Sequence, residues 1–209
     1  MKIQNYTFLR SGWSSLAIAV LAATPSWASG PQFHYDALTA SCKNAQGQMG
    51  LNHTADYLGE CADYAGSTLS GSKFDGANLA GTSFAGATLQ GASFREADLR
   101  GTNFQAAKIM DSDFQGAILA NTNLRGAAVV RSNFTEANLS TSDASRAQFK
   151  NSTFTAADLT GADLSGHTLI SKNSLEGNSV RGARFDGYTI LPNKSAAAIL
   201  TSQGAIQVE

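Results

Sequence analysis

Five side chains of this 209-residue chain have the chemistry to cross-link a protein, bind a metal or act as a base. They are His34, Cys42, His53, Cys61 and His167. In an oxidising compartment two cysteines predict a disulfide, which would close a loop of about 18 residues and stabilise the fold by roughly 3 kcal/mol. The spacing of the first four residues matches no close pair of zinc ligands. We therefore expect a Cys42–Cys61 disulfide, with a metal or small-ligand site in the same segment as the alternative.

These side chains do not predict an enzyme. Nucleophilic catalysis needs a nucleophile, a base and an orienting group in one cleft, whereas His167 lies far along the chain from His34 and His53. We expect a non-catalytic protein that carries no cofactor and no catalytic metal.

The first 28 residues have the features of a secretory signal peptide. Lys2 and Arg10 precede an apolar stretch at residues 16–23, and small residues stand at the two positions that a signal peptidase reads. We predict cleavage between Ala28 and Ser29. A membrane anchor is the alternative, but the stretch is shorter than the roughly 20 residues that cross a bilayer, so we expect no stable anchor after cleavage.

A period of five residues organises the rest of the chain. From Tyr64 to Leu169 every fifth residue is large and apolar except Ala144, and the residue two places earlier is Ala, Ser or Thr except at His167. A helix repeats every 3.6 residues and a strand every 2, so neither fits. A chain that turns about a right angle every five residues does fit, and glycines two places after many apolar residues suit corners with positive φ. Such a period is typical of a stacked array of repeats.

The pentads resemble the pentapeptide-repeat family, whose motif is A(D/N)LXX, and they are similar to its exported, cyanobacterial-type members. The motif occurs at Ala77-Asn78-Leu79, Ala97-Asp98-Leu99, Ala137-Asn138-Leu139, Ala157-Asp158-Leu159 and Ala162-Asp163-Leu164. The resemblance implies an all-β fold, a right-handed quadrilateral β-helix with four pentads per coil. Exported members of the family occur in the periplasm or the thylakoid lumen, and the sequence does not choose between the two.

With four pentads per coil, residues twenty apart should stack in four interior columns. One column consists of phenylalanines, at Phe74, Phe94, Phe114, Phe134 and Phe154. A second runs from Leu79 to Leu159, and a third contains Tyr64, Phe84 and Phe104.

Two irregularities interrupt these columns. We expect Phe149 to fill the space that the small side chain of Ala144 leaves. After Leu169 the period slips, and we expect one extra residue between 170 and 174. That insertion would place Val180 on the leucine column and Phe185 on the column of Tyr64.

The two ends of the array differ from its middle and are expected to cap it, because open strand edges promote aggregation. We expect an amino-terminal cap at 29–61, pinned by the disulfide, and repeats at 62–191. A carboxyl-terminal cap at 192–209 would contain a short helix that starts after Ser195 and ends before Gly204.

The charges do not point to nucleic acid. The chain has 15 Lys and Arg against 16 Asp and Glu, scattered along the sequence without a basic run, so binding to nucleic acid has little electrostatic support. Nor is there the dense acidic face with which gyrase inhibitors of this family imitate DNA. That function is the weaker alternative.

One wall of the coil carries apolar residues on its outside. Met110 and Val130 follow the central residues of successive coils, with Ala128 beside them and Ile170 two coils further on. We interpret these residues as a candidate partner patch. The sequence thus favours a rigid interaction or scaffold module with an unidentified protein partner, and it leaves the oligomeric state open.

Overall fold

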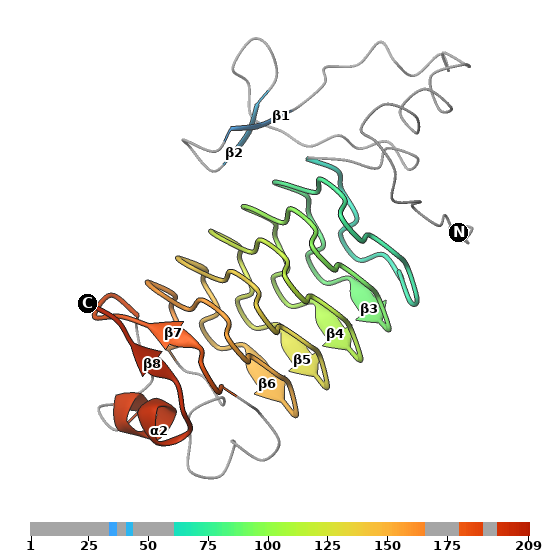
Figure 1. Cartoon of the computed structure of the whole chain (residues 1–209). Coiled ribbons are helices and arrows are strands. Elements are labelled where there is room, and N and C mark those ends of the chain that lie inside the picture. The colour runs from blue at the N-terminus through green and yellow to red at the C-terminus, as the bar shows by residue number, and fades with distance from the viewer. Residues whose placement is uncertain (1–33, 37–40, 44–60, 166–179, 190–195) are drawn as a thin grey trace, which may run out of the picture.

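Four-sided coils of twenty residues, stacked along one axis, build most of the molecule (Figure 1). This computed structural model describes residues 34–36, 41–43, 61–165, 180–189 and 196–209. Parallel backbone bridges on each side of the coil join residues twenty apart, as predicted from the pentads. The four series of bridges include Asp63 to Ser83, Thr68 to Thr88, Lys73 to Ser93 and Asn78 to Asp98.

One side of the coil pairs over three residues and forms a regular parallel sheet. Its strands, in order, are β3 (Thr88–Gln90), β4 (Lys108–Met110), β5 (Ala128–Val130) and β6 (Gln148–Lys150). They lie side by side along one edge of the stack (Figure 1). The central residue of each strand is buried and the flanking residues face outward, so this wall displays two columns of side chains to solvent.

Short local bonds make each corner. The Ala97 N–H donates to the Phe94 carbonyl within a turn, while the Phe94 N–H donates to the Asp113 carbonyl of the next coil. The Asp113 carboxylate in turn accepts the N–H of Gln115 at 3.1 Å, and Asp or Asn plays the same part throughout the array. These recurring polar residues therefore satisfy the corner backbone, as their periodic placement indicates.

The interior is a packed column of aromatic and aliphatic side chains. Rings of the phenylalanine column stack nearly parallel, with centroids 4.8 Å apart between Phe94 and Phe114 and between Phe114 and Phe134. In the first coils the opposite column meets them edge-on, as Phe104 does against Phe114. Where that column loses its rings, Phe149 from the adjacent wall makes the edge-on contact to Phe134, at 5.9 Å, and is only 2% exposed. The interior position predicted for Phe149 is confirmed.

The predicted register after the slip is wrong. Asp158 bridges Arg184, twenty-six residues on, so Phe185 continues the leucine column above Leu159. The Ala156 N–H donates to the Arg181 carbonyl, which places Val180 on the phenylalanine column. The insertion is thus six residues long instead of one. The five-residue period cannot distinguish an insertion of one residue from an insertion of six. The two lengths differ by a whole pentad, so both leave the following apolar residues in the same phase.

The carboxyl end closes the described stack with a helix and a strand. β7 (Arg184–Phe185) pairs in parallel with β8 (Ile206–Gln207), and α2 (Ala196–Ser202) precedes β8. Leu200 of α2 is fully buried against the interior columns. The short helix is confirmed, and Gly204 follows it with φ of +87°. The additional strand β8 has no periodic signal in the sequence.

Candidate functional site

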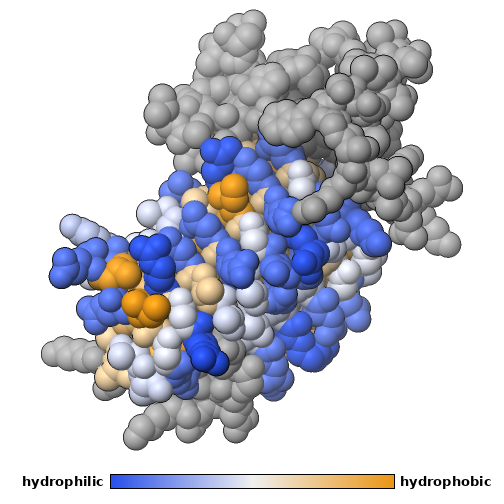
Figure 2. All heavy atoms as spheres, viewed as in Figure 1, coloured by the Kyte–Doolittle hydropathy of each residue, from blue (hydrophilic) through white to orange (hydrophobic). Residues whose placement is uncertain are grey.

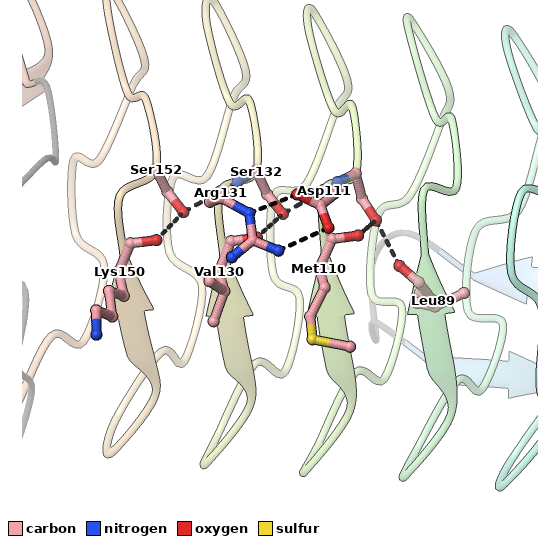
Figure 3. A network of polar contacts seen from close by, with 9 residues as sticks. Leu89, Met110, Asp111, Val130, Arg131, Ser132, Lys150 and Ser152 are labelled. Carbon is pink, nitrogen blue, oxygen red and sulfur yellow. Dashed lines mark hydrogen bonds and ion pairs between the residues drawn. The ribbon is translucent and has the colours of Figure 1, made fainter.

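The outward face of the β3–β6 sheet brings together three of the four residues of the predicted partner patch. Register pairs Met110 with Val130 and Lys108 with Ala128 on neighbouring strands. Met110, Ala128 and Val130 are half-buried, while Lys108 and Lys150 are exposed. Figure 3 shows Met110, Val130 and Lys150 projecting from successive coils in one row. The fourth patch residue, Ile170, lies outside the described residues.

A ladder of serines fixes the backbone under this row. The Ser112 N–H donates to Oγ of Ser132 at 3.3 Å, and the Ser132 N–H donates to Oγ of Ser152 at 3.2 Å. Each hydroxyl also donates to a carbonyl two residues earlier, Val130 for Ser132 and Lys150 for Ser152 (Figure 3). All three serines are buried, so their bonds hold successive coils in one register without water.

An ion pair at the corner spans two of the same coils. Nε and Nη2 of Arg131 lie 2.6 and 2.8 Å from the two carboxylate oxygens of Asp111 (Figure 3). The hydrogen bond to Arg131 lowers the pKa of Asp111, and the same bond raises the pKa of Arg131. Sequence analysis missed this pair, although two opposite charges at equivalent corners twenty residues apart are a readable signal.

The cysteine predictions remain predictions. Cys61 is fully buried, and no free cysteine is present among the residues that the structure describes. Cys42 lies on β2 (Ser41–Lys43), where its backbone pairs with Tyr35 of the antiparallel strand β1 (His34–Asp36). The side chain of Cys42 lies outside the described residues, so the structure does not test the disulfide.

Other predicted sites fall outside the described residues altogether. They are the cleavage site at Ala28 and Ser29, and the two histidines His53 and His167. Within the described ranges, no group of three or more His, Cys, Asp or Glu side chains could hold a metal ion. The same ranges contain no helix of the length and apolarity needed to cross a membrane.

The architecture and the sequence together define the class of protein. Parallel twenty-residue coils with a buried apolar residue in every pentad form a repeat β-helix, that is, a β-solenoid. The model of the pentapeptide repeat region matches residues 67–142, and the model of pentapeptide repeats in eight copies matches residues 130–166. Residues 67–166 are therefore pentapeptide repeats, the repeats that define the pentapeptide-repeat family.

Similar solved structures include two pentapeptide repeat proteins. A pentapeptide repeat protein from the Arabidopsis thaliana thylakoid lumen is 28% identical over 50% of this chain and 69% of its own, with a TM-score of 0.41. HetL, a pentapeptide repeat protein involved in heterocyst differentiation regulation in Nostoc sp. strain PCC 7120, is 20% identical over 60% of this chain and 72% of its own, with a TM-score of 0.30.

A third similar structure is that of an antibiotic resistance protein. The plasmid-mediated fluoroquinolone resistance protein QnrB1 is 21% identical over 77% of this chain and 95% of its own, with a TM-score of 0.33. A comparison with curated protein sequences finds no match.

Proposed function

We propose that this protein is an exported, non-catalytic interaction module, a rigid rod that presents the β3–β6 wall to a protein partner. The observation that carries the proposal is the row of Met110 and Val130 on a wall whose backbone is fixed by buried serines. A rigid surface binds with little loss of conformational entropy on association. Export, to the periplasm or the thylakoid lumen, is supported by the leader-like residues 1–28.

The packed interior supports the non-catalytic part of the proposal. Side chains of all four columns are buried from the first coils to the last described ones, so within these coils only the outer walls offer a surface for binding. Figure 2 shows one face of the molecule as mainly hydrophilic, with few strongly apolar residues. Among the described residues only three large apolar side chains are exposed, at Ile118, Tyr188 and Ile206.

Cross-linking and affinity purification from the native compartment test this role. We expect a specific protein to be captured by the wild-type chain and lost on the double change Met110→Glu and Val130→Glu. The control is Ile118→Glu, which places a glutamate at a 40% exposed apolar residue on the opposite wall of the coil. A partner set that is unchanged by the double variant, or no specific partner at all, would contradict the proposed role of the patch.

The amino terminus of the isolated protein tests the export part separately. Mass spectrometry should find a chain that begins at Ser29. An intact leader on protein recovered from the compartment would reject cleavage at this site.

A further inference from the structure

Folding gathers charges that the sequence scatters. We define the basic wall as the outward residues of β3–β6 together with the corner residues on both sides of the sheet. Within residues 61–165 this wall has five basic side chains and one acidic side chain, Asp111. The basic ones are Lys108, Arg125, Arg131, Arg146 and Lys150.

The other three walls of the same coils have the opposite sign. They carry three basic residues, Lys73, Arg95 and Arg100, two of which pair with carboxylates: Arg95 with Asp113 at 2.8 Å and Arg100 with Asp98 at 2.5 Å. Against these stand nine acidic side chains. They are Asp63, Asp75, Glu96, Asp98, Asp113, Glu136, Asp143, Asp158 and Asp163. The expectation that the charges are merely scattered is therefore wrong for the folded molecule.

Four of the five cations on the basic wall are available. Lys108, Arg125, Arg146 and Lys150 are exposed, and none has an ion-pair partner within the part of the chain that the structure describes. Only Arg131 is engaged, with Asp111. With neighbouring strands about 4.8 Å apart, Lys108 and Lys150 lie two strands, or about 10 Å, apart along the stack.

From this arrangement we infer that the basic wall binds an acidic polypeptide. Carboxylates of the partner pair with Lys108, Lys150 and the corner arginines, and an apolar partner side chain packs on Met110 and Val130 beside these cations. The inference rests on the proposed function, because it names the partner class for the same wall.

The apolar centre is what favours a polypeptide over a nucleic acid or a lipid surface. Protein interfaces have a largely apolar centre within a polar, charged rim. Met110 and Val130 are bordered by cations, with Lys108 on the same strand as Met110 and Lys150 one strand beyond Val130. A nucleic-acid backbone offers phosphates at short, regular spacing and no side chain for the apolar centre. The wall is also short, so we expect a weak, salt-sensitive complex.

Binding to synthetic polymers tests the inference on the intact protein. The probes are random poly(Glu,Tyr), which supplies carboxylates and apolar rings, and poly-glutamate, which supplies carboxylates alone. We expect poly(Glu,Tyr) to bind more tightly than poly-glutamate and the affinity to fall as salt rises. Changing Met110 and Val130 together to Ser should remove the preference for the tyrosine-containing polymer.

Charge reversal provides the matched control. Lys108→Glu and Lys150→Glu should each weaken poly(Glu,Tyr) binding about tenfold, whereas Lys73→Glu should change it less than twofold. Lys73 is an exposed lysine that, like Lys108, directly precedes a central residue, but it stands on the phenylalanine wall.

Three results would overturn the inference: no polymer binding, an equal loss in all three lysine variants, or tighter wall-dependent binding of duplex DNA or phosphatidylglycerol vesicles. The polymers need no native partner, so their failure is distinguishable from failure of the partner search. A captured partner that resists Lys108→Glu and Lys150→Glu but is lost with Met110→Glu and Val130→Glu would leave the interaction role standing and reject only the acidic partner.

Discussion

Single residues at the corners carry the strain of this fold. Two places after each central residue from Tyr64 to Leu159 the backbone enters the left-handed region. Eleven residues other than glycine adopt φ between +51° and +59°, ten of them at these corners and the eleventh at Cys61. A side chain in that region is less stable than glycine by roughly 1–2 kcal/mol. The residues concerned are Cys61, Glu96, Ala106, Asp111, Asn121, Arg131, Glu136, Thr141, Arg146, Asn151 and Ala156.

Exchanging glycine and alanine at two exposed corners of one edge isolates this strain. Gly126 has φ of +67° and open space around the position of a Cβ atom, so Gly126→Ala should destabilise the protein by about 1 kcal/mol through backbone strain alone. Ala106, at φ of +55° one coil earlier, should gain about 0.5–1 kcal/mol on change to Gly. Urea unfolding of both variants measures the effect, and shifts of the same sign in both would refute the argument.

The individual residues of the site show what the sequence could and could not predict. The inward or outward direction of Met110, Val130 and Phe149 followed from the pentad phase alone. The pairing of Asp111 with Arg131 and the shared wall of Lys108 and Lys150 did not follow so directly, because both depend on the coil length of twenty. The prediction of the partner patch applied that length to the apolar outer positions, and these pairs of charges emerge only when it is applied to the charged outer positions as well.

At the scale of elements, the phenylalanine column is the main contributor to packing. Phe114 is fully buried and stacks on both Phe94 and Phe134. Phe114→Ala removes both stacked contacts and leaves a cavity in the middle of the array, so we expect a loss of roughly 3–5 kcal/mol in the free energy of unfolding. Chemical denaturation measures it, with Phe114→Leu, which keeps most of the volume, as the milder comparison. No loss in the alanine variant would contradict the column.

The return of the chain after the insertion depends on one carboxylate. Asp186 accepts the N–H of Gly161 at 2.9 Å and that of Thr189 at 2.9 Å. These bonds, led by the one from Gly161, lower the pKa of Asp186 below its ordinary value of 3.8. Because the folded pKa lies below the unfolded one, its stabilising effect is complete above about pH 4 and is lost as pH falls through the folded pKa.

Asp186→Asn should therefore lower Tm at pH 7, since a neutral amide accepts these bonds less strongly than a carboxylate. The Tm values of the variant and the wild type should converge as pH falls through the folded pKa of Asp186, because below it the carboxyl is protonated in both states. Thermal melts across this range give the comparison. A Tm difference that stays constant from pH 7 to pH 2 would reject a role for the charge.

The five-residue period predicts some of the structural elements and not others. The repeat predicted the coil, the columns and the short helix α2, because each follows from spacing or from local capping residues. The period could not predict the length of the insertion before Val180, because adding a whole pentad leaves the phase of every later apolar residue unchanged. Strand β8 was likewise not predicted, because Ile206 and Gln207 pair with β7 through the backbone and leave no pattern in side chains.

For the whole molecule, the array has one basic and three acidic walls, yet the chain has nearly balanced charge. Such a rod can associate through its walls or through its ends. The ends are more prone to aggregation, because a terminal coil presents unpaired strand edges. At the carboxyl end, α2 and β8 cover the last described coil, with the Ile206 N–H donating to the Ala183 carbonyl and the Val208 N–H to the Phe185 carbonyl.

Removing this cover should convert a soluble rod into one that associates end to end. A chain that stops after Ser195 loses Leu200 from the interior and leaves the Ala183 and Phe185 carbonyls open to pairing with another copy. We expect concentration-dependent oligomers by light scattering and a lowered Tm, with the β signal in circular dichroism retained. Ile206→Lys is the control, since it changes an exposed side chain but keeps the strand. A truncated chain that remains monomeric with an unchanged Tm would show that the terminal coil protects itself without its cap.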